Sequence, residues 1–277
     1  EEISSKFDLN KYQIIETKSE LQEWQIKAEN IGYVSFDTET NSLDAMNADM
    51  IGFSLCTSEN DACYVPLLHT NEGERQLKFD QAIEILRQIL EDEGIKKILH
   101  NMKYDALVID KYNIKIKNFD DTMLMSYSLG SGGVRHKLDT LIKYYFNHDA
   151  ISFKELIGSG KDKKTFQELS IEEAGKYAAE DADMTLRLWK KIKSSISINK
   201  QVKIYEIIEK PLIKVLIQME KNGISIDIDR LSKLSKTFES KLLELEKLCF
   251  NLIDEEVNLG SPKPVSYTHL TLPTTLQ

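Results

Sequence analysis

The stretch "VSFDTETNSLD", residues 34–44, sets an apolar, β-branched run directly against two carboxylates, Asp37 and Glu39. Side chains alternate between the faces of a strand, so Asp37 and Glu39 point to one face and the intervening Thr38 to the other. Two carboxylates about 4 Å apart repel by on the order of 4 kcal/mol at an effective dielectric constant near 20. The pair therefore predicts either a cation between the two acids or a solvated strand end, and the solvated end is the commoner case.

Around this stretch, the first 200 residues alternate between strand-like and helix-like patterns. Three short runs rich in strand formers follow one another closely, which predicts neighbouring antiparallel strands. The pattern as a whole predicts an α/β fold, with a mixed five-stranded sheet flanked by helices. The predicted strands are 33–39, 50–58, 62–68, 95–101 and 116–120, and the clearest helices are 79–94, 102–113 and 170–195.

The pattern changes after about residue 200. Two long amphipathic helices are predicted at 203–223 and 229–256, with Pro211 as a kink or break near the start of the first. No strand accompanies them, which indicates the beginning of a separate helical module. The last stretch, residues 264–277, lacks charge and is rich in threonine, and we expect it to form a disordered tail.

The composition is that of an ordinary globular protein, with 41% hydrophobic and 29% charged residues. A net charge of −9 argues against a general basic surface for nucleic acid, although metal ions could supply positive charge locally. Three cysteines without a C-x-x-C pair indicate a reduced compartment and neither a disulfide framework nor a zinc site. There is no apolar run of transmembrane length, and the N-terminal stretch "EEISSKFDLN" resembles no signal peptide. Since the chain lacks an initiator Met, we expect it to begin inside a longer protein.

A second constellation lies in "HNMKYDALVI", residues 100–109. Asn101 and Asp105 are four residues apart, so they share one face at the start of a helix. The apolar residues that follow Asp105 are an unusual setting for a surface carboxylate. The alternative is an Asn that caps the helix and an Asp that complements its N-terminal dipole.

A third constellation lies in "KYAAEDADMT", residues 176–185, where Tyr177 and Asp181 have the same spacing. A phenol and a carboxylate would then project from one helical face. The alternative is a half-buried tyrosine beside an exposed acidic patch that Asp181 forms with Glu180 and Asp183.

Taken together, the three constellations supply four acids, which are Asp37, Glu39, Asp105 and Asp181. Carboxylate oxygens suit hard divalent cations such as Mg²⁺ or Mn²⁺, and no His or Cys competes for a softer metal. Two such ions can clamp the attacking and leaving oxygens of an in-line phosphoryl displacement. Because four converging acids would repel one another without metal, we expect cation binding and function to be inseparable.

The motifs "FDTETNSLD" (36–44), "HNMKYD" (100–105) and "YAAEDADMTL" (177–186) resemble the three exonuclease motifs of the DEDD superfamily of 3′–5′ exonucleases. Within it, the chain resembles the proofreading domains of family A polymerases, the bacterial DNA polymerase I type. Tyr177 marks the tyrosine subclass, because Lys176 stands where the histidine subclass has its His. The resemblance covers roughly residues 10–263 and implies a ribonuclease H-like fold.

The resemblance also implies roles for the acids and the tyrosine. Asp37, Glu39 and Asp181 would hold one Mg²⁺ ion, and Asp37 and Asp105 would face a second, with Mn²⁺ as a substitute. Tyr177 would orient the water or hydroxide that attacks the 3′-terminal phosphate. It would not act as a base, because a tyrosine with a pKa near 10 is a poor base at neutral pH.

Four further residues match positions that contact the terminal nucleotides in the family. Leu43 would be a wedge against the terminal base. The aromatic side chains of Tyr104 and Phe153 would stack on bases of any sequence, as a proofreader requires. For Leu43 and Phe153, ordinary core packing is the alternative. The implied DNA contacts are Leu43, Asn101, Tyr104 and Phe153.

The implied activity is metal-dependent 3′–5′ hydrolysis of single-stranded or frayed DNA 3′ ends, as the proofreading part of DNA replication and repair. We expect a cytoplasmic bacterial monomer without membrane contact and with weak affinity for DNA when metal is absent. The alternatives are a ribonuclease-D-like exonuclease acting on RNA and a catalytically inactive structural module.

The resemblance divides the chain into three parts. Residues 1–200 correspond to the exonuclease domain, and 201–263 to the start of the polymerase thumb. Residues 264–277 have no family counterpart and are interpreted as foreign sequence appended to a truncated gene. Because the polymerase palm is missing, we expect no polymerisation, and the missing polymerase region of the same protein is an expected partner.

Overall fold

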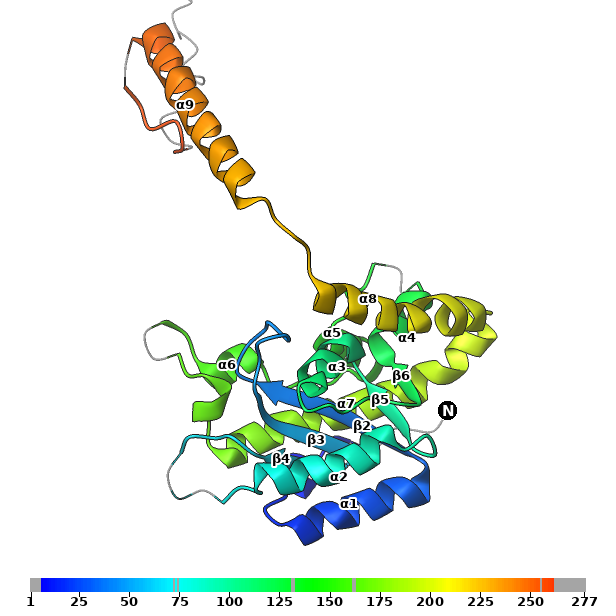
Figure 1. Cartoon of the computed structure of the whole chain (residues 1–277). Helices are drawn as coiled ribbons and strands as arrows, with labels where there is room; N and C mark the ends of the chain where they lie inside the picture. Colours follow the sequence, from blue (N-terminus) through cyan, green and yellow to red (C-terminus); the bar gives the residue numbers. More distant parts are fainter. Residues whose placement is uncertain are drawn as a thin grey trace, which may run out of the picture. The chain divides into compact units, whose positions relative to one another are not determined.

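A computed structural model of the chain shows a mixed sheet with the strand order β1-β4-β3-β2-β5-β6 (Figure 1). The structure describes residues 6–71, 73, 75–130, 133–160, 163–254 and 256–261, so the expected tail at 264–277 lies outside the described residues. The chain divides into two compact units, Glu1–Asn222 and Gly223–Gln277. The sheet belongs to the first unit.

The five predicted strands are all present, and the expected antiparallel arrangement of β2, β3 and β4 is confirmed. β5 and β6 continue the sheet in parallel on the other side of β2. The predicted number of strands was wrong, because a sixth strand, β1, pairs in parallel with β4 at the edge. β1 has only two residues, too few for an alternating pattern to reveal. The strands are β1 (Gln13–Ile14), β2 (Tyr33–Thr40), β3 (Met50–Ser58), β4 (Asp61–Pro66), β5 (Lys96–Leu99) and β6 (Phe119–Asp121).

Helices cover both faces of this sheet (Figure 1). The longest, α7, begins after Ser170, whose hydroxyl accepts a hydrogen bond from the backbone N–H of Glu173, as an N-cap should. The helices of the first unit up to this point are α1 (Lys18–Ile31), α2 (Phe79–Glu91), α3 (Met102–Asp110), α4 (Thr122–Ser128), α5 (Leu138–Phe146), α6 (Phe153–Ile157) and α7 (Ile171–Ile198), with 3-10 turns at η1 (Leu9–Lys11) and η3 (Phe166–Glu168).

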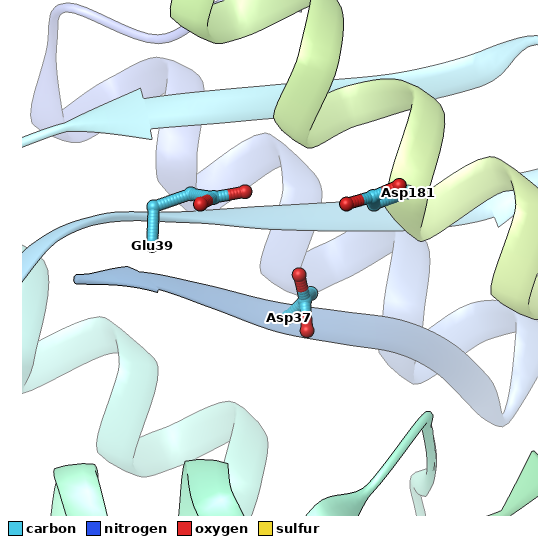
Figure 2. A group of neighbouring side chains, drawn as sticks. All are labelled: Asp37, Glu39 and Asp181. Carbon is cyan, nitrogen blue, oxygen red and sulfur yellow. The ribbon is translucent and has the colours of Figure 1, made fainter. Parts of the chain in front are cut away.

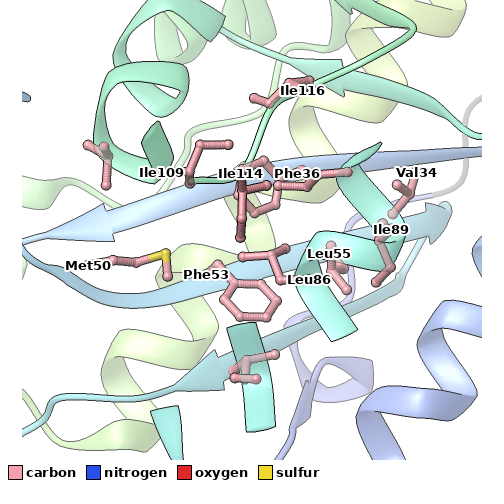
Figure 3. Packing of buried hydrophobic residues seen from close by; sticks show 14 of the residues in the cluster. Val34, Phe36, Met50, Phe53, Leu55, Leu86, Ile89, Ile109, Ile114 and Ile116 are labelled. Atoms are coloured by element: carbon pink, nitrogen blue, oxygen red, sulfur yellow. The ribbon is translucent and has the colours of Figure 1, made fainter. Parts of the chain in front are cut away.

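The alternation of β2 assigns its side chains to two different cores. Val34 and Phe36 are fully buried in the larger core, which packs the sheet against α1, α2 and α3 (Figure 3). On the opposite face α7 lies across β2, β3 and β4, and its small residues Ala178 and Ala179 are fully buried there. Asp37 and Glu39 therefore face α7.

After α7 the first unit continues through a π-helical segment, η4 (Ile204–Glu209), into α8 (Lys210–Asn222). The break predicted around Pro211 takes this form, since proline lacks the N–H that a regular α-helical turn would use. Tyr205 and Ile213 are buried, at 2% and 3% exposure, so this segment is packed into the first unit. The unit thus extends beyond residue 200. The assignment of 201–263 to a polymerase thumb stays a prediction.

The second unit contains α9 (Ile228–Ile253), which is capped by Asp227 through the backbone N–H of Arg230. None of the residues of α9 is buried, although the helix carries many large apolar side chains. Among the helices of the described ranges, none has the length and apolar character that a membrane span requires.

Candidate active site and metal centre

Three of the predicted acids converge where β2 meets α7. Asp37 and Glu39 from β2 and Asp181 from α7 each bring one carboxylate oxygen within 4.8 Å of the others, and the three groups turn toward a common space (Figure 2). Glu39 is only 8% exposed. Its Oε1 atom is buried and has no hydrogen-bond partner among the described residues. The interpretation of this stretch as a solvated strand end is therefore wrong.

Burial and mutual repulsion act together on these acids. Burial raises the pKa of Asp37 to about 7. The pKa of Glu39 is raised well above its ordinary value by burial and then by the charges of Asp37, Asp181 and Asp105. Burial and the charge of Asp37 likewise raise the pKa of Asp181. Such shifts are typical of a site built to be neutralised by a cation.

Asp105 approaches the site from the other face of the sheet and does not belong to the three-carboxylate group. It lies in the first turn of α3 and is 2% exposed. One of its oxygens accepts hydrogen bonds from Thr38, at 3.0 Å from the backbone N–H and 2.6 Å from the hydroxyl. Its pKa is raised by burial and then by the charge of Asp37.

The side chain of Asn101 does not cap α3, so that half of the alternative is wrong, while Asp105 does lie in the first turn of the helix. The backbone of Asn101 adopts the left-handed conformation, with φ 67° and ψ 48°, and its side chain makes no capping hydrogen bond. The N–H groups at this helix start bind Asp121 instead. Asn101 lines a groove of about 490 Å³ together with Asp37 and Asp181.

Tyr177 donates a hydrogen bond to the carboxylate of Asp181, one turn further along α7. Its pKa is raised by burial and then by the charges of Asp181, Glu39 and Asp37. The phenol therefore stays protonated at neutral pH and acts as a hydrogen-bond donor. The predicted role of Tyr177 as an orienting group rather than a base requires this protonated form, and the role stays a prediction.

The neighbours of Asp181 do not form an exposed acidic patch, so that alternative is also wrong. Glu180 is 1% exposed and lies 2.8 Å from His148 Nε2. Asp183 is fully buried and pairs with Arg187 in the next turn of the helix. Both acids anchor α7 to other parts of the unit, and they thereby fix the direction in which Asp181 points.

A cleft of about 440 Å³ opens beside the carboxylates and holds three of the four predicted DNA contacts, Leu43, Tyr104 and Phe153. Leu43 is 96% exposed, so core packing is wrong for this residue. Phe153 is 42% exposed, and its ring lies 5.7 Å from that of Tyr177. It forms part of the cleft wall. The fourth predicted contact, Asn101, faces the separate groove described above.

Several residues around the site were not predicted from the sequence. Thr38, between the two acids of β2, binds Asp105, and its place in the D-T-E triplet is the signal that could have indicated this. Asp121 directly precedes an apolar helix, as N-cap residues do. Lys163 and Lys164 line the cleft opposite the acids. No motif distinguishes these two from the other lysines of the chain.

Comparison with known proteins agrees with this geometry. Residues 12–197 match the family model described as 3′-5′ exonuclease. DNA polymerase I of Rhizobium leguminosarum is 40% identical over 93% of this chain and 27% of its own length. DNA polymerase I of Pseudomonas aeruginosa is 37% identical over 95% of this chain and 30% of its own. The chain thus spans less than a third of the length of these relatives.

Solved structures share the fold at low sequence identity. The POL domain of Pol1 from M. smegmatis, in complex with DNA primer-template and dNTP, matches with a TM-score of 0.70 at 19% identity, over 96% of this chain and 42% of that one. Escherichia coli RNase D, an exoribonuclease, matches with a TM-score of 0.58 at 17% identity, over 75% of this chain and 51% of that one. Because the family model covers well over half of the chain, the chain belongs to the 3′-5′ exonuclease family that is found in DNA polymerase I.

Proposed function

We propose that the chain is a two-metal-dependent 3′–5′ exonuclease that removes the terminal nucleotide from single-stranded or frayed DNA, as the proofreading part of a DNA polymerase I. The observation that carries the proposal is the convergence of Asp37, Glu39 and Asp181, with one buried oxygen of Glu39 lacking a hydrogen-bond partner in the described part of the chain. Buried carboxylate oxygens normally have a hydrogen-bond or ionic partner. A buried carboxylate oxygen without a protein partner is therefore expected where a cation binds.

The donor set fits Mg²⁺ or Mn²⁺, because every candidate ligand is a carboxylate oxygen. Asp37, Glu39 and Asp181 would hold one ion, and Asp37 and Asp105 would face the second. When bound, the ions supply positive charge at the attacking and leaving oxygens of the displacement.

The residues of the chain would prepare the attack in three ways. Thr38 holds one oxygen of Asp105, and this limits the rotation of the carboxylate. The hydroxyl of Tyr177 is anchored on Asp181 and, because it remains protonated, can orient the attacking water by hydrogen bonding. The half-buried setting of these groups limits access of bulk water and strengthens their electrostatic interactions.

The cleft beside the acids is shaped for the end of a single strand. Leu43 projects almost fully into solvent at its edge, where an apolar side chain can wedge against the terminal base. Tyr104 and Phe153 offer ring surface on which bases stack without regard to sequence. Lys163 and Lys164 provide positive charge for the phosphates of the strand.

DNA is the favoured substrate because the relatives at 40% and 37% identity are DNA polymerases, whereas the likeness to RNase D extends only to the fold. The inactive-module alternative lacks support, because three acids converge on one space beside Tyr177, and the fourth, Asp105, is buried and bound to Thr38. A polymerase region like that of the DNA polymerase I relatives is the proposed partner of the second unit, whose helix exposes Leu231, Phe238 and Leu242.

The test is an exonuclease assay on a 5′-labelled single-stranded oligonucleotide, with a matched RNA oligonucleotide beside it. With Mg²⁺ we expect stepwise shortening of the DNA from its 3′ end and much slower loss of the RNA. Asp37→Ala and Asp181→Ala should each abolish shortening. Activity that survives EDTA would rule out the metal mechanism, and preferential loss of the RNA would favour the ribonuclease alternative.

A further inference from the structure

Asp121, at the end of β6, is a buried carboxylate that the proposed mechanism does not use. It is 1% exposed and accepts hydrogen bonds from four backbone N–H groups. Two come from the first turn of its own helix α4, from Met123 at 2.9 Å and Leu124 at 3.3 Å. The other two come from the start of α3, from Asn101 at 3.2 Å and Met102 at 2.9 Å. One side chain thus caps the N-termini of two helices.

The bonds to α3 decide what the side chain of Asn101 can do. The side chain of an Asn in the N-cap position normally accepts a hydrogen bond from a backbone N–H group of the first helical turn. Here Asp121, which is 20 residues further along the chain, accepts the hydrogen bonds of those N–H groups. The side chain of Asn101 makes no capping bond. The amide of Asn101 can therefore face the groove next to Asp37 and Asp181.

The same carboxylate holds both helical walls of this groove. Asn101 lines it from α3 and Met123 lines it from α4, and both are bound to Asp121 through their backbone N–H groups. The carboxylate therefore helps to fix the separation of the two walls, beside the pairing of β5 with β6 and the bond between His100 and Thr122.

Asp121 is itself anchored by the segment that follows α7. Its backbone N–H donates to the hydroxyl of Tyr205 at 2.9 Å, and Tyr205 donates to Asp120 at 3.1 Å. Asp120 also pairs with Lys96 and Lys210. The segment that follows α7 is thereby connected to the groove.

We propose that Asp121 is a positioning residue of the exonuclease, which caps α3 in place of Asn101 and so fixes the Asn101 side chain against the terminal nucleotides. The inference rests on the proposed function, in which Asn101 contacts DNA. Asp121 touches neither the substrate nor the carboxylates of the metal site, so its effect reaches the reaction only through the placement of α3 and α4.

The first test is Asp121→Asn in the full chain. Asn can still cap its own helix through Oδ1, but it has one acceptor oxygen instead of two, so the N–H of Met102, which binds Oδ2, loses its partner. We expect the KM for a single-stranded oligonucleotide to rise about tenfold and kcat to change less than about twofold. The Mn²⁺ affinity measured by titration calorimetry should be unchanged, because the three converging carboxylates lie on β2 and α7.

Asp120→Asn is the matched control, because it makes the same substitution at the adjacent buried position. Asp120 binds Lys96, Lys210, Trp189 and Tyr205. No contact with α3 is among them. We expect a lower melting temperature and an unchanged KM, because the amide oxygen of the introduced Asn still accepts from Tyr205 and so keeps the anchor of Asp121. An equal rise of KM in this control would overturn the inference, since a general loss of stability would then explain the effect.

A double-mutant cycle with Asn101→Ala separates positioning from independent contributions. Asn101→Ala alone should raise KM about tenfold, and adding it to Asp121→Asn should raise KM by less than about twofold more. Multiplicative effects would overturn the inference while leaving the proposed function intact. A wild-type chain without exonuclease activity overturns both.

Tyr205→Phe replaces Asp121→Asn in the cycle if the latter does not fold. This variant removes only the hydroxyl that anchors the backbone of Asp121. We expect a smaller rise of KM, about threefold, that again is not multiplied by Asn101→Ala. An unchanged KM in a folded Tyr205→Phe protein would contradict the inference.

Discussion

Thr38 and Asp105 are joined by two hydrogen bonds to a single carboxylate oxygen, one from the backbone of β2 and one from the threonine hydroxyl. Thr38 points away from the α7 face that holds Asp37 and Glu39, so the two sides of one strand serve two parts of the site. This places Asp105 next to Asp37 even though it comes from a helix on the opposite face of the sheet.

We expect Thr38→Val to keep the packing but to weaken the hold on Asp105. The hydroxyl bond to a buried carboxylate is worth about 1.5–3 kcal/mol. If a loss of about 1.4 kcal/mol appears in the transition state, kcat falls about tenfold. Single-turnover kinetics with Mg²⁺ measures this directly.

Ser35→Ala is the control for this substitution. Ser35 lies on the same strand, is fully buried, and its hydroxyl has no hydrogen-bond partner in the described part of the chain. Removing it should leave kcat unchanged and should not lower the melting temperature. A similar loss of activity in both variants would show that any substitution in β2 lowers activity, and would contradict a specific effect of the bond between Thr38 and Asp105.

The raised pKa of Asp37 leads to a prediction for the metal-free protein. Its folded-state pKa of about 7 lies above the ordinary value of 3.8, so the folded state retains a proton that the unfolded state has lost. The corresponding stability is fully present below about pH 4 and is lost as the pH rises through about 7. Asp37→Asn should therefore raise the free energy of unfolding at pH 8 by more than about 1 kcal/mol.

Urea denaturation at pH 5 and pH 8, with and without Mn²⁺, measures this effect. The stabilisation by Asp37→Asn should be smaller at pH 5, and Mn²⁺ at pH 8 should stabilise the wild type more than the variant. Glu23→Gln, which removes an exposed acid on α1, should show neither difference. Equal stability of wild type and Asp37→Asn at pH 8 without metal would contradict the electrostatic description of the site.

The strands were predictable from short runs rich in strand formers, and the helices from apolar residues at helical spacing. β2 and β3 are buried on both faces of the sheet. β1 was not predictable, because two residues carry no period and its pairing with β4 depends on tertiary contact. The π-helical turns before Pro211 were predictable only as an irregularity.

The acids of the site were predictable from spacing, because residues two apart on a strand or four apart on a helix share a face. The environment of Asp183 was not. Its partners Tyr12 and Asn60 lie far away in sequence, so only the folded chain shows that this acid is buried and paired. The capping of α3 by Asp121 escaped prediction for the same reason.

The lysines of the cleft should govern the salt dependence of DNA binding. Lys163 and Lys164 are exposed and, within the described ranges, form no ion pair, so Lys163→Ala with Lys164→Ala should leave the fold intact. We expect KM to rise about fivefold, and the slope of log affinity against log salt to become shallower by about 1. Lys154→Ala, an exposed lysine on α6 that does not line the cleft, is the control. An unchanged salt slope in the double variant would exclude these lysines from phosphate binding.

Gly52 is the residue of β3 that lies directly opposite Glu39 in the sheet. A Cβ atom at this position would lie 2.3 Å from the hydroxyl and 2.5 Å from Cζ of Tyr64, which is itself fully buried. We expect Gly52→Ala to cost about 1–3 kcal/mol of unfolding free energy, because the Tyr64 ring must move within a packed core. Since that movement occurs beside Glu39, the Mn²⁺ affinity should fall as well.

Ser54→Ala, two residues further along β3, introduces the same side chain without a clash and should change neither quantity. Thermal denaturation and Mn²⁺ titration of the two variants measure both effects, and a Gly52→Ala protein as stable as Ser54→Ala would show that the sheet has more room at the metal site than the position of Tyr64 indicates.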